Sequence, residues 1–375
     1  DDLLVEAARR LVSSVRESDT VARIGGDEFL IILEELETKN QRQIVTIAQK
    51  ILSLFSVPFI FDRREAFITA SIGITVYPDD GDDSTVLLKN ADAAMYKVKG
   101  EQRNAFLFFT PEMNKKAIER MEMEHCLRHA LENKEMTIHY QPLVDAVSEK
   151  LIGAEALLRW NNPVLGAVGP DRFIPLAEET GFIIPLTEWV LETACREAKK
   201  WPVRAQSHPL RLSVNISSRS FKGGDFVKTV MCVLKENDFP PDCLELEVTE
   251  RLLIDDPAKA LRIFYELSRK GVRLSVDDFG TGYSALTYLK EFPFHTLKID
   301  RAFVRGIIKE PKDAALAKAI IAISHSLGLK AIGEGVETEE QLQCLRSMGC
   351  DLAQGYYFSK PLPAAEFQDF AFRSS

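Results

Sequence analysis

The sequence has few cysteines and histidines and no long apolar run. Its six cysteines are scattered without a CxxC pair, which argues against a disulfide framework and against a zinc site built on cysteine. No stretch approaches the ~20 apolar residues of a membrane span, and no secretory signal opens the chain. We therefore expect a cytoplasmic protein with free thiols and no membrane segment in this chain. Because the chain opens on Asp1 and not on Met, we expect a longer parent protein, with room for a membrane tether upstream.

Basic residues are fewer than acidic residues. Lys and Arg number 47 against 56 Asp and Glu, so the 375-residue chain carries a formal net charge of -9. Phosphate backbones repel such a chain, which excludes DNA and RNA as general partners. A phosphate substrate would have to be met by metal ions or by a local basic patch. The length suits about two domains, each able to bury a core.

The first part of the chain, residues 1–109, mixes helical and strand patterns, as in one compact α/β domain. Apolar periodicity predicts helices at Leu3–Val15, Ile44–Phe55 and Thr85–Lys97 and strands at Thr20–Ile24, Phe29–Leu33 and Ala66–Val76. Thr110-Pro111 then begins a long charged helix, residues 110–134, which we interpret as a connector merging into a second domain at 117–375. His125 and His129 lie four residues apart on this helix and could share a face as metal ligands, but without a third ligand nearby we expect an ordinary exposed or half-buried face.

The second part of the chain shows strand-like runs separated mostly by helical stretches. Eight such runs over roughly 240 residues predict a (β/α)₈ barrel. The runs are Thr137–Val144, Lys150–Leu158, Leu210–Ile216, Cys243–Val248, Val272–Asp277, Thr296–Ile299, Leu329–Ile332 and Asp351–Phe358.

Polar residues recur at the ends of these strands. In a barrel the carboxyl ends of the strands meet on one face, where active sites form. One acidic strand end is commonly a helix cap, but the habit repeats along nearly every strand. The oxygen-rich set predicts a site for Mg²⁺ or Mn²⁺, because hard cations prefer carboxylate and amide oxygens. Its members are Glu155, Asn215, Glu247, Asp277, Asp278, Lys298, Glu334 and Gln354.

The residues alone leave the reaction open. Two metals bridged by an aspartate would polarise a phosphate and activate a water. Lys298 would then orient that water or stabilise charge on phosphate oxygens, or it would only form a salt bridge within the cluster. Enolase-type enzymes use a similar set of groups to abstract a proton beside a carboxylate. Phosphodiester hydrolysis and metal-assisted enolisation therefore both remain.

At these positions the sequence resembles the EAL family of cyclic di-GMP phosphodiesterases. The resemblance runs from Lys115 to the C-terminus. It covers EALLRW at Glu155, FIPLAEETG at Phe173, SVNIS at Ser213, ELEVTE at Glu245, DDFGTGYSAL at Asp277, LKID at Leu297, GEGVET at Gly333 and QGYYFSKPLP at Gln354. It implies a TIM-like barrel that hydrolyses c-di-GMP to linear pGpG in second-messenger signalling, with a homodimer formed through the EAL domains.

The resemblance also implies a role for each site residue. One metal would be held by Glu155, Asn215, Glu247 and Asp277, and a second by Asp277 and Asp278, giving two Mg²⁺ or Mn²⁺ ions per site. The catalytic group would be Lys298, Glu334, Gln354 and Glu250. Lys298 would orient the water, Glu334 and Gln354 would complete the metal and water shell, and Glu250 would anchor the DDFGTGYS loop. The substrate would contact Gln141, Arg159 and Glu337. In the family this loop links the metal site to the dimer interface, and we hypothesise the same coupling here.

The first domain resembles GGDEF diguanylate cyclases. The resemblance covers RIGGDEF at Arg23, SIGIT at Ser71, ADAAMYKVK at Ala91 and Arg103-Asn104. Gly25-Gly26-Asp27 alone would indicate only a plain hairpin turn. The resemblance adds Glu28 as a metal ligand and Lys99 and Arg103 as triphosphate contacts, so that GTP would bind in the intact protein. Arg16 and Asp19 match the family's inhibitory RxxD site, or else form an exposed ion pair.

The family's cyclase domain begins with a strand that carries another metal-binding aspartate. Asp1-Asp2 aligns with the end of that region, so we expect the GGDEF domain to be incomplete at its N-terminus and this chain to lack cyclase activity. Two alternatives to the phosphodiesterase stay open: a non-catalytic c-di-GMP receptor, and a bifunctional cyclase/phosphodiesterase in the full-length protein.

Overall fold

The structure is a computed structural model that describes residues 2–34, 41–61, 64–101, 104–202, 210–222, 225–250, 257–280 and 286–374. The chain divides into two compact units, Asp1–Glu122 and Met123–Ser375. The division falls inside helix α4 (Pro111–His129), so the helix that the sequence predicts as a connector has one end in each unit. His125 and His129 are both exposed on it, as expected.

The second unit is an eight-stranded barrel in the described part of the chain. Its strands pair in sequence order, and the last returns to the first. They are β7 (Met136–Asp145), β8 (Leu151–Asn162), β10 (Arg211–Asn215), β11 (Leu244–Thr249), β12 (Arg273–Phe279), β13 (Thr296–Ile299), β14 (Lys330–Gly333) and β15 (Leu352–Gln354). Short strands β9 (Gly166–Val168) and β16 (Leu362–Pro363) extend β8 and β7. The predicted barrel class is therefore confirmed.

The first barrel strand differs from a regular (β/α)₈ arrangement. Strand β7 runs antiparallel to both of its neighbours, β8 and β15, whereas the other strands are mutually parallel. The link from β7 to β8 is only residues 146–150. A parallel crossover needs about a dozen residues or more, so this link can only form a hairpin.

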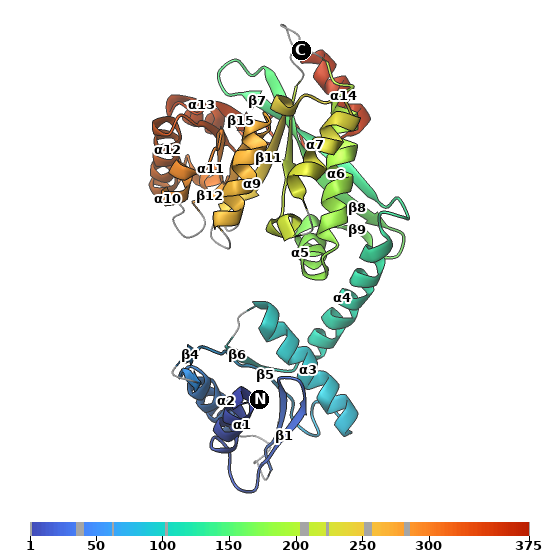
Figure 1. Ribbon diagram of the computed structural model, residues 1–375, viewed down its shortest axis with the longest axis vertical. Helices are drawn as coiled ribbons and strands as arrows, with labels where there is room; N and C mark the ends of the chain where they lie inside the picture. The colour runs from blue at the N-terminus through green and yellow to red at the C-terminus, as the bar shows by residue number, and fades with distance from the viewer. Residues whose placement is uncertain are drawn as a thin grey trace. The chain divides into compact units, whose positions relative to one another are not determined.

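Helices surround the strands on the outside (Figure 1). Helix α9 shows why: its buried residues are Ala260, Ile263, Phe264 and Leu267, one apolar stripe at helical spacing. The barrel helices are α5 (Pro170–Thr180), α6 (Ile183–Ala198), α7 (Phe226–Glu236), α9 (Pro257–Arg269), α10 (Leu286–Glu291), α11 (Arg301–Gly306), α12 (Pro311–Ser326), α13 (Glu339–Ser347) and α14 (Ala364–Arg373), with the 3₁₀ turns η1 (Ser218–Lys222) and η2 (Pro241–Cys243).

The strands bury both faces. In β11, Leu244, Leu246 and Val248 alternate with Glu245 and Glu247, and all five are buried. The leucines and the valine belong to the apolar core cluster. Because side chains alternate along a strand, the two glutamates share the opposite face, which is the barrel interior. This alternation places the charged groups of the site inside the barrel.

Two expected strands are wrong in extent. Ala66–Val76 is not one strand, because β4 (Arg64–Ala66) pairs antiparallel with β3 (Phe59–Phe61), whereas β5 (Ser71–Ile74) pairs parallel with β6 (Ala105–Phe108). The chain leaves one sheet and enters another. The strand expected at Asp351–Phe358 ends at Gln354. The next residue, Gly355, lies so close to the Val336 backbone that a Cβ on it would be 2.1 Å from the Val336 carbonyl oxygen.

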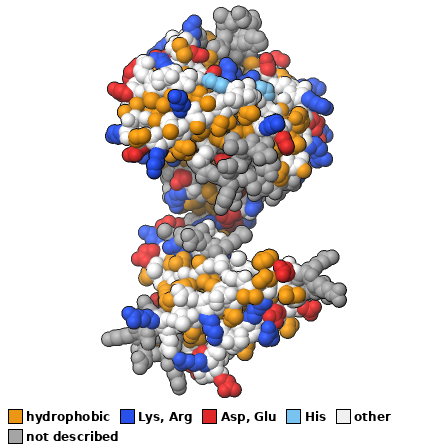
Figure 2. All heavy atoms as spheres, turned by 90° about the vertical axis from the view of Figure 1, so that its left-hand side faces the viewer, with side chains coloured by type: hydrophobic (Ala, Val, Ile, Leu, Met, Phe, Trp, Pro, Cys, Tyr) orange, Lys and Arg blue, Asp and Glu red, His pale blue; other side chains and the backbone are white. Residues whose placement is uncertain are grey.

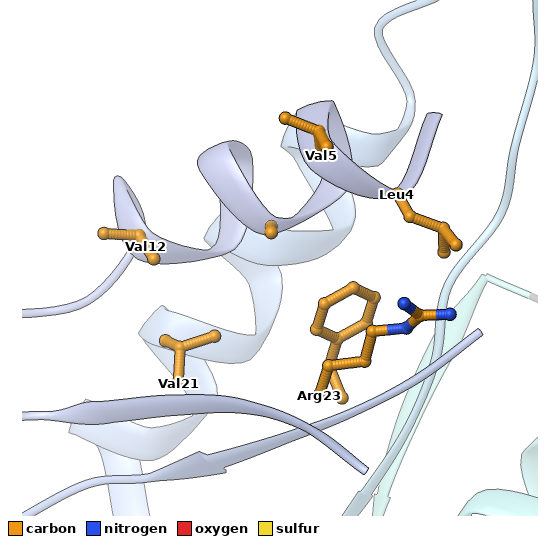
Figure 3. Close-up of a pocket in the computed structure, with 7 residues that line it drawn as sticks. Leu4, Val5, Val12, Val21 and Arg23 are labelled. Atoms are coloured by element: carbon orange, nitrogen blue, oxygen red, sulfur yellow. The ribbon is translucent and has the colours of Figure 1, made fainter. Parts of the chain in front are cut away.

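The first unit contains three two-stranded sheets in its described residues. The remaining elements are α1 (Asp2–Val12), β1 (Thr20–Gly25), β2 (Glu28–Ile32), α2 (Gln41–Phe55) and α3 (Ser84–Glu101). Its main apolar cluster includes Leu11 and Phe59. A pocket at α1 and the β1–β2 hairpin is lined by residues that include Leu4, Val5 and Val12 of the helix and Val21 and Arg23 of β1 (Figure 3).

The surface shows no large charged region of one sign on the face drawn in Figure 2, where acidic and basic side chains are interspersed. Among the described residues, no helix is both long and apolar enough to cross a lipid bilayer.

Candidate active site

Lys298 lies at the centre of the predicted strand-end cluster. Its side chain is 1% exposed, and its Nζ lies 2.5 Å from Glu247 Oε2, 2.6 Å from Glu334 Oε1, 3.2 Å from Asp277 Oδ1 and 3.6 Å from Glu155 Oε2. The four carboxylates come from β8, β11, β12 and the residue after β14. The parallel register places polar residues of neighbouring strands at the same level of the barrel. Glu247 pairs with Asn215 of β10 on one side and with Ser275 of β12, two residues before Asp277, on the other.

Amide side chains complete the ring around Glu155. Asn215 Nδ2 donates to Glu155 Oε1 at 2.6 Å, and Gln354 Nε2 donates to Glu155 Oε2 at 2.7 Å. Gln354 Nε2 also lies 3.2 Å from Gln141 Oε1. Antiparallel β7 brings Gln141 here, since it pairs directly with Glu155. Gln141, expected as a substrate contact, thus also belongs to the hydrogen-bond network of the cluster.

The cluster holds more negative charge than its lysine can balance. Burial, followed by the neighbouring carboxylates, raises the pKa of Glu247 well above its usual value despite Lys298. The same causes raise the pKa of Glu334 to about 8 and that of Asp278 to about 6. Burial opposes the charge on Lys298, but the surrounding carboxylates, Asp277 first, raise its pKa well above the usual value.

This donor set fits a divalent cation. Four carboxylates surround one ammonium group, and Asp277, Asp278 and Glu334 each offer an oxygen within 4.8 Å of the others. Such crowding of like charges is costly unless a cation neutralises it. Every candidate ligand is an oxygen, which matches Mg²⁺ and Mn²⁺. Glu155, Asn215, Glu247, Asp277 and Asp278 are the residues that would hold the ions.

Asp278 has a backbone conformation that the sequence did not predict. Its φ is +53°, in the left-handed region, and the β12–β13 register shifts between Val276 and Phe279. Side chains of adjacent strand residues normally face opposite ways, yet both Asp277 and Asp278 reach the same cluster. The left-handed residue explains this, and such strain is typical of functional sites.

Glu250 lies beside the start of the DDFGTGYS loop. It is buried, and its Oε2 accepts a hydrogen bond of 3.4 Å from the backbone N–H of Gly280. Gly280 has φ +97°, which favours glycine. This contact is consistent with the expected anchoring role. Residues 281–285 of the loop lie outside the described residues, so its coupling to a dimer interface stays a prediction.

The other expected substrate contacts are Arg159 and Glu337. Arg159 is half-buried and donates to the Leu158 carbonyl oxygen. Burial lowers the pKa of Arg159, while the charges of Tyr356 and Glu155 act in the opposite direction. Glu337 is exposed, and its backbone N–H donates to Gln341 Oε1 at 2.7 Å. Among the described residues, neither Arg159 nor Glu337 forms an ion pair with the carboxylates around Lys298.

The GGDEF motif forms the tip of a hairpin. Gly26 has φ +52°, and Arg23 donates through Nε and Nη2 to its carbonyl oxygen. Asp27 and Glu28 are exposed at this tip. Lys99 is exposed near the end of α3, and Arg103 lies outside the described residues.

The RxxD segment is a turn held by Asp19. Its Oδ2 accepts from the Arg16 backbone N–H at 2.8 Å, and its Oδ1 accepts from the Glu34 backbone N–H at 3.1 Å. Arg16 is exposed. The contact between the two residues is thus a backbone cap, and neither expected role, inhibitory site or ion pair, is tested by it.

Sequence reasoning missed two polar contacts near the site. Glu178 accepts from Ser217 Oγ, two residues after Asn215. Glu245, on the same face of β11 as Glu247, pairs with Arg211 at 2.9 Å and lies 3.6 Å from Arg273. Glu178 stands within the quoted FIPLAEETG motif, and the buried Glu245 could have been found from the period-two alternation of LELEVT.

Family profiles match both units. The profile described as "EAL domain" matches residues 124–361, and the profile described as "Diguanylate cyclase, GGDEF domain" matches residues 1–105. Curated proteins are similar to nearly the whole chain. MucR of Pseudomonas aeruginosa, named a bifunctional diguanylate cyclase/cyclic di-GMP phosphodiesterase, is 43% identical over 366 residues, which are 98% of this chain and 53% of MucR.

Two further relatives are named cyclic di-GMP phosphodiesterases. NbdA of Pseudomonas aeruginosa is 39% identical over 370 residues, covering 99% of this chain and 47% of NbdA. PdeR of Escherichia coli is 38% identical over 368 residues, covering 98% of this chain and 55% of PdeR. The chain spans about half the length of the curated relatives it matches.

A solved structure described as the PaMucR phosphodiesterase in complex with c-di-GMP covers 66% of this chain and 99% of its own, with 42% identity and a TM-score of 0.63. The cAMP-bound EAL enzyme Bd1971 covers 77% of this chain and 76% of its own, with 30% identity and a TM-score of 0.65. The chain therefore belongs to the EAL family, and a GGDEF domain region precedes its EAL domain.

Proposed function

We propose that the EAL domain hydrolyses c-di-GMP to linear pGpG in a metal-dependent reaction. The observation that carries this proposal is the buried ring of carboxylates around Lys298 at the strand ends. Its support is the likeness to relatives named c-di-GMP phosphodiesterases and to a solved chain that holds c-di-GMP. Every position of the metal set that the family resemblance implies holds a residue with an oxygen ligand in this sequence. This favours an enzyme over a receptor.

The carboxylates and the amide divide into two overlapping ligand groups. Glu155, Asn215, Glu247 and Asp277 would hold one Mg²⁺ or Mn²⁺ ion, and Asp277 with Asp278 would hold a second. Bound ions supply polarisation of the phosphate and a lowered pKa of water. Asn215 contributes its carbonyl oxygen, because its Nδ2 already donates to Glu155.

Lys298 would act at the reacting phosphate. Its ammonium group, fixed by carboxylates on several sides, can donate to the attacking water or to a phosphate oxygen on which charge develops. Water adds to phosphorus, the bond from phosphorus to the 3′ oxygen breaks, and that oxygen takes up a proton. One ring opening gives pGpG with a 5′ phosphate. Glu334 would hold Lys298 in position, and Gln354 would hold Glu155. Glu250 would order the DDFGTGYS loop.

Charged and amide groups outside the ring would hold the rest of the dinucleotide. Arg159 can bind a phosphate through two parallel N–H donors, and the exposed carboxylate of Glu337 can accept hydrogen bonds from guanine N–H groups. Gln141 would meet the substrate beside Gln354.

The GGDEF region would regulate the barrel or act as a cyclase only in the intact protein, where GTP would be its ligand. The relative named bifunctional supports that second role for a whole protein. Lack of cyclase activity in this chain, a homodimer through the EAL domains and a cytoplasmic location stay predictions.

The test is incubation of the chain with c-di-GMP and Mn²⁺, with and without a chelator, and chromatography of the products. We expect pGpG in the presence of Mn²⁺, none with chelator, and none with Lys298→Ala. Tight binding of c-di-GMP by the wild type without any pGpG would refute the enzyme and favour a receptor.

A further inference from the structure

Glu178 occupies an unfavourable place unless it has a partner. It lies in the last turn of α5, next to Glu179, and that turn contains no basic residue. The C-terminal end of a helix carries partial negative charge, so carboxylates there are destabilising. Glu178 is also half-buried, which adds a desolvation cost. A carboxylate kept at such a position needs a donor, and the structure supplies one.

The donor is the hydroxyl of Ser217. Ser217 Oγ donates to Glu178 Oε1 at 2.6 Å, and it accepts from the backbone N–H of Arg219 at 3.3 Å. Both hydrogen-bonding roles of the hydroxyl are thus in use. A second link joins the same segments, because Arg219 Nη1 donates to the Glu179 carbonyl oxygen at 3.2 Å. The segment after β10 is therefore tied at two points to the end of α5.

That segment begins at the candidate metal ligand Asn215. The ladder continues one residue beyond it, since the Ile216 N–H donates to the Glu247 carbonyl oxygen at 2.8 Å. Asn215 donates to Glu155 at 2.6 Å, which leaves its carbonyl oxygen to face a cation. Ser217 is the next polar side chain along the strand direction. Its attachment to Glu178 fixes where the backbone turns away from the barrel into η1.

We infer that Glu178 is a positioning residue for Asn215, acting through Ser217. This inference rests on the proposed function, because it assigns Asn215 to a cation. Glu178 itself would touch neither the ion nor the substrate. Partners that orient metal ligands in this way typically change metal affinity by about 10- to 100-fold when they are removed.

The experiment measures Mn²⁺ affinity directly, without substrate, from the free Mn²⁺ signal in electron paramagnetic resonance. The variants are Glu178→Ala, Ser217→Ala, their double variant and Glu178→Gln. Glu188→Ala on α6 is the matched control, because Glu188 is an exposed carboxylate on the neighbouring helix. Asn215→Ala sets the size of the loss when the ligand itself is removed. Thermal melts verify that each variant is folded.

We expect Glu178→Ala and Ser217→Ala each to weaken Mn²⁺ binding about tenfold, and the double variant to lose no more than either, because both remove the same contact. Glu178→Gln should retain most of the affinity, since its amide oxygen still accepts from Ser217. Glu188→Ala should bind as the wild type does.

Unchanged Mn²⁺ affinity in Glu178→Ala, with a loss in Asn215→Ala, would overturn the inference and leave the proposed function standing. Additive losses in the double variant would also overturn it. Mn²⁺ binding by the wild type without pGpG formation would count against the proposed enzymatic function only. The Mn²⁺ affinities of the variants could still be compared, so the inference on Glu178 would still be tested. A wild type that binds no Mn²⁺ would overturn both.

Discussion

Neutralising Glu334 should stabilise the protein in the absence of metal. Burial and neighbouring carboxylates raise its pKa from 4.5 to about 8. An acid whose folded pKa is raised keeps a proton that the unfolded chain releases, so stability is lost as pH rises from 4.5 towards 8. At about pH 7.5 that window spans three units, which at ~1.36 kcal/mol each amount to about 4 kcal/mol of destabilisation by the wild-type residue.

The variant Glu334→Gln removes this cost but weakens one contact. Lys298 Nζ lies 2.6 Å from Glu334 Oε1, and a weakened hydrogen bond to this ammonium group offsets about 2 kcal/mol. A net gain of about 2 kcal/mol remains, which corresponds to a rise of roughly 4–8 °C in the melting temperature of a domain of this size.

The assay is thermal unfolding in chelator at about pH 7.5 and again near pH 4.5. At the lower pH the protonation cost largely disappears and only the weakened contact remains, so the variant should no longer melt above the wild type. Glu337→Gln, three residues away and exposed, is the control and should not shift the melting temperature. Excess Mn²⁺ should reverse the order, since the wild type binds the ion more tightly. A variant that melts below the wild type in chelator at about pH 7.5 would refute the electrostatic reasoning.

Three further predictions concern the same barrel. Lys298→Ala should reduce pGpG formation by at least about 100-fold in a product assay, and residual activity near the wild-type rate would remove Lys298 from the reaction. Mn²⁺ affinity should rise between pH 6 and pH 8.5, because the cation must displace protons from Asp278, whose pKa is about 6, and from Glu334, whose pKa is about 8. Calorimetry in two buffers should detect the released protons. Glu245→Gln should lower the free energy of unfolding by ~3 kcal/mol in urea denaturation, because it leaves Arg211 and Arg273 without their shared buried carboxylate; an unchanged midpoint would contradict this.

The barrel and most of its site could be predicted because strand periodicity reports them directly. Continuous apolar runs indicate strands buried on both faces, and a polar residue that ends such a run has to face the barrel mouth. Glu247, Asp277 and Lys298 satisfy this rule, whereas Glu155 lies within β8. The structure places an oxygen of each of the three carboxylates within 3.6 Å of Lys298 Nζ.

Other features depend on contacts that periodicity does not encode. The antiparallel direction of β7 follows from the short link at 146–150, and it places Gln141 opposite Glu155. The left-handed backbone at Asp278 is a conformation that aspartate adopts more often than most residues but only occasionally, so the residue type alone does not predict it. The Glu178–Ser217 contact joins residues far apart in sequence, so the FIPLAEETG motif can single out Glu178 but cannot identify Ser217 as its partner.

Glu245 and Glu247 show how the barrel separates stability from function. They lie two residues apart on one strand, face the same interior and are 1–2% exposed. Glu245 has two arginines, and their charges lower its pKa against the effect of burial. Glu247 shares one lysine with three other carboxylates, and its pKa is raised. A fold optimised for stability alone would balance both glutamates, because an uncompensated buried charge is costly. On the proposed function, a bound cation would balance the charge at Glu247, and this end of the strand would be the functional one.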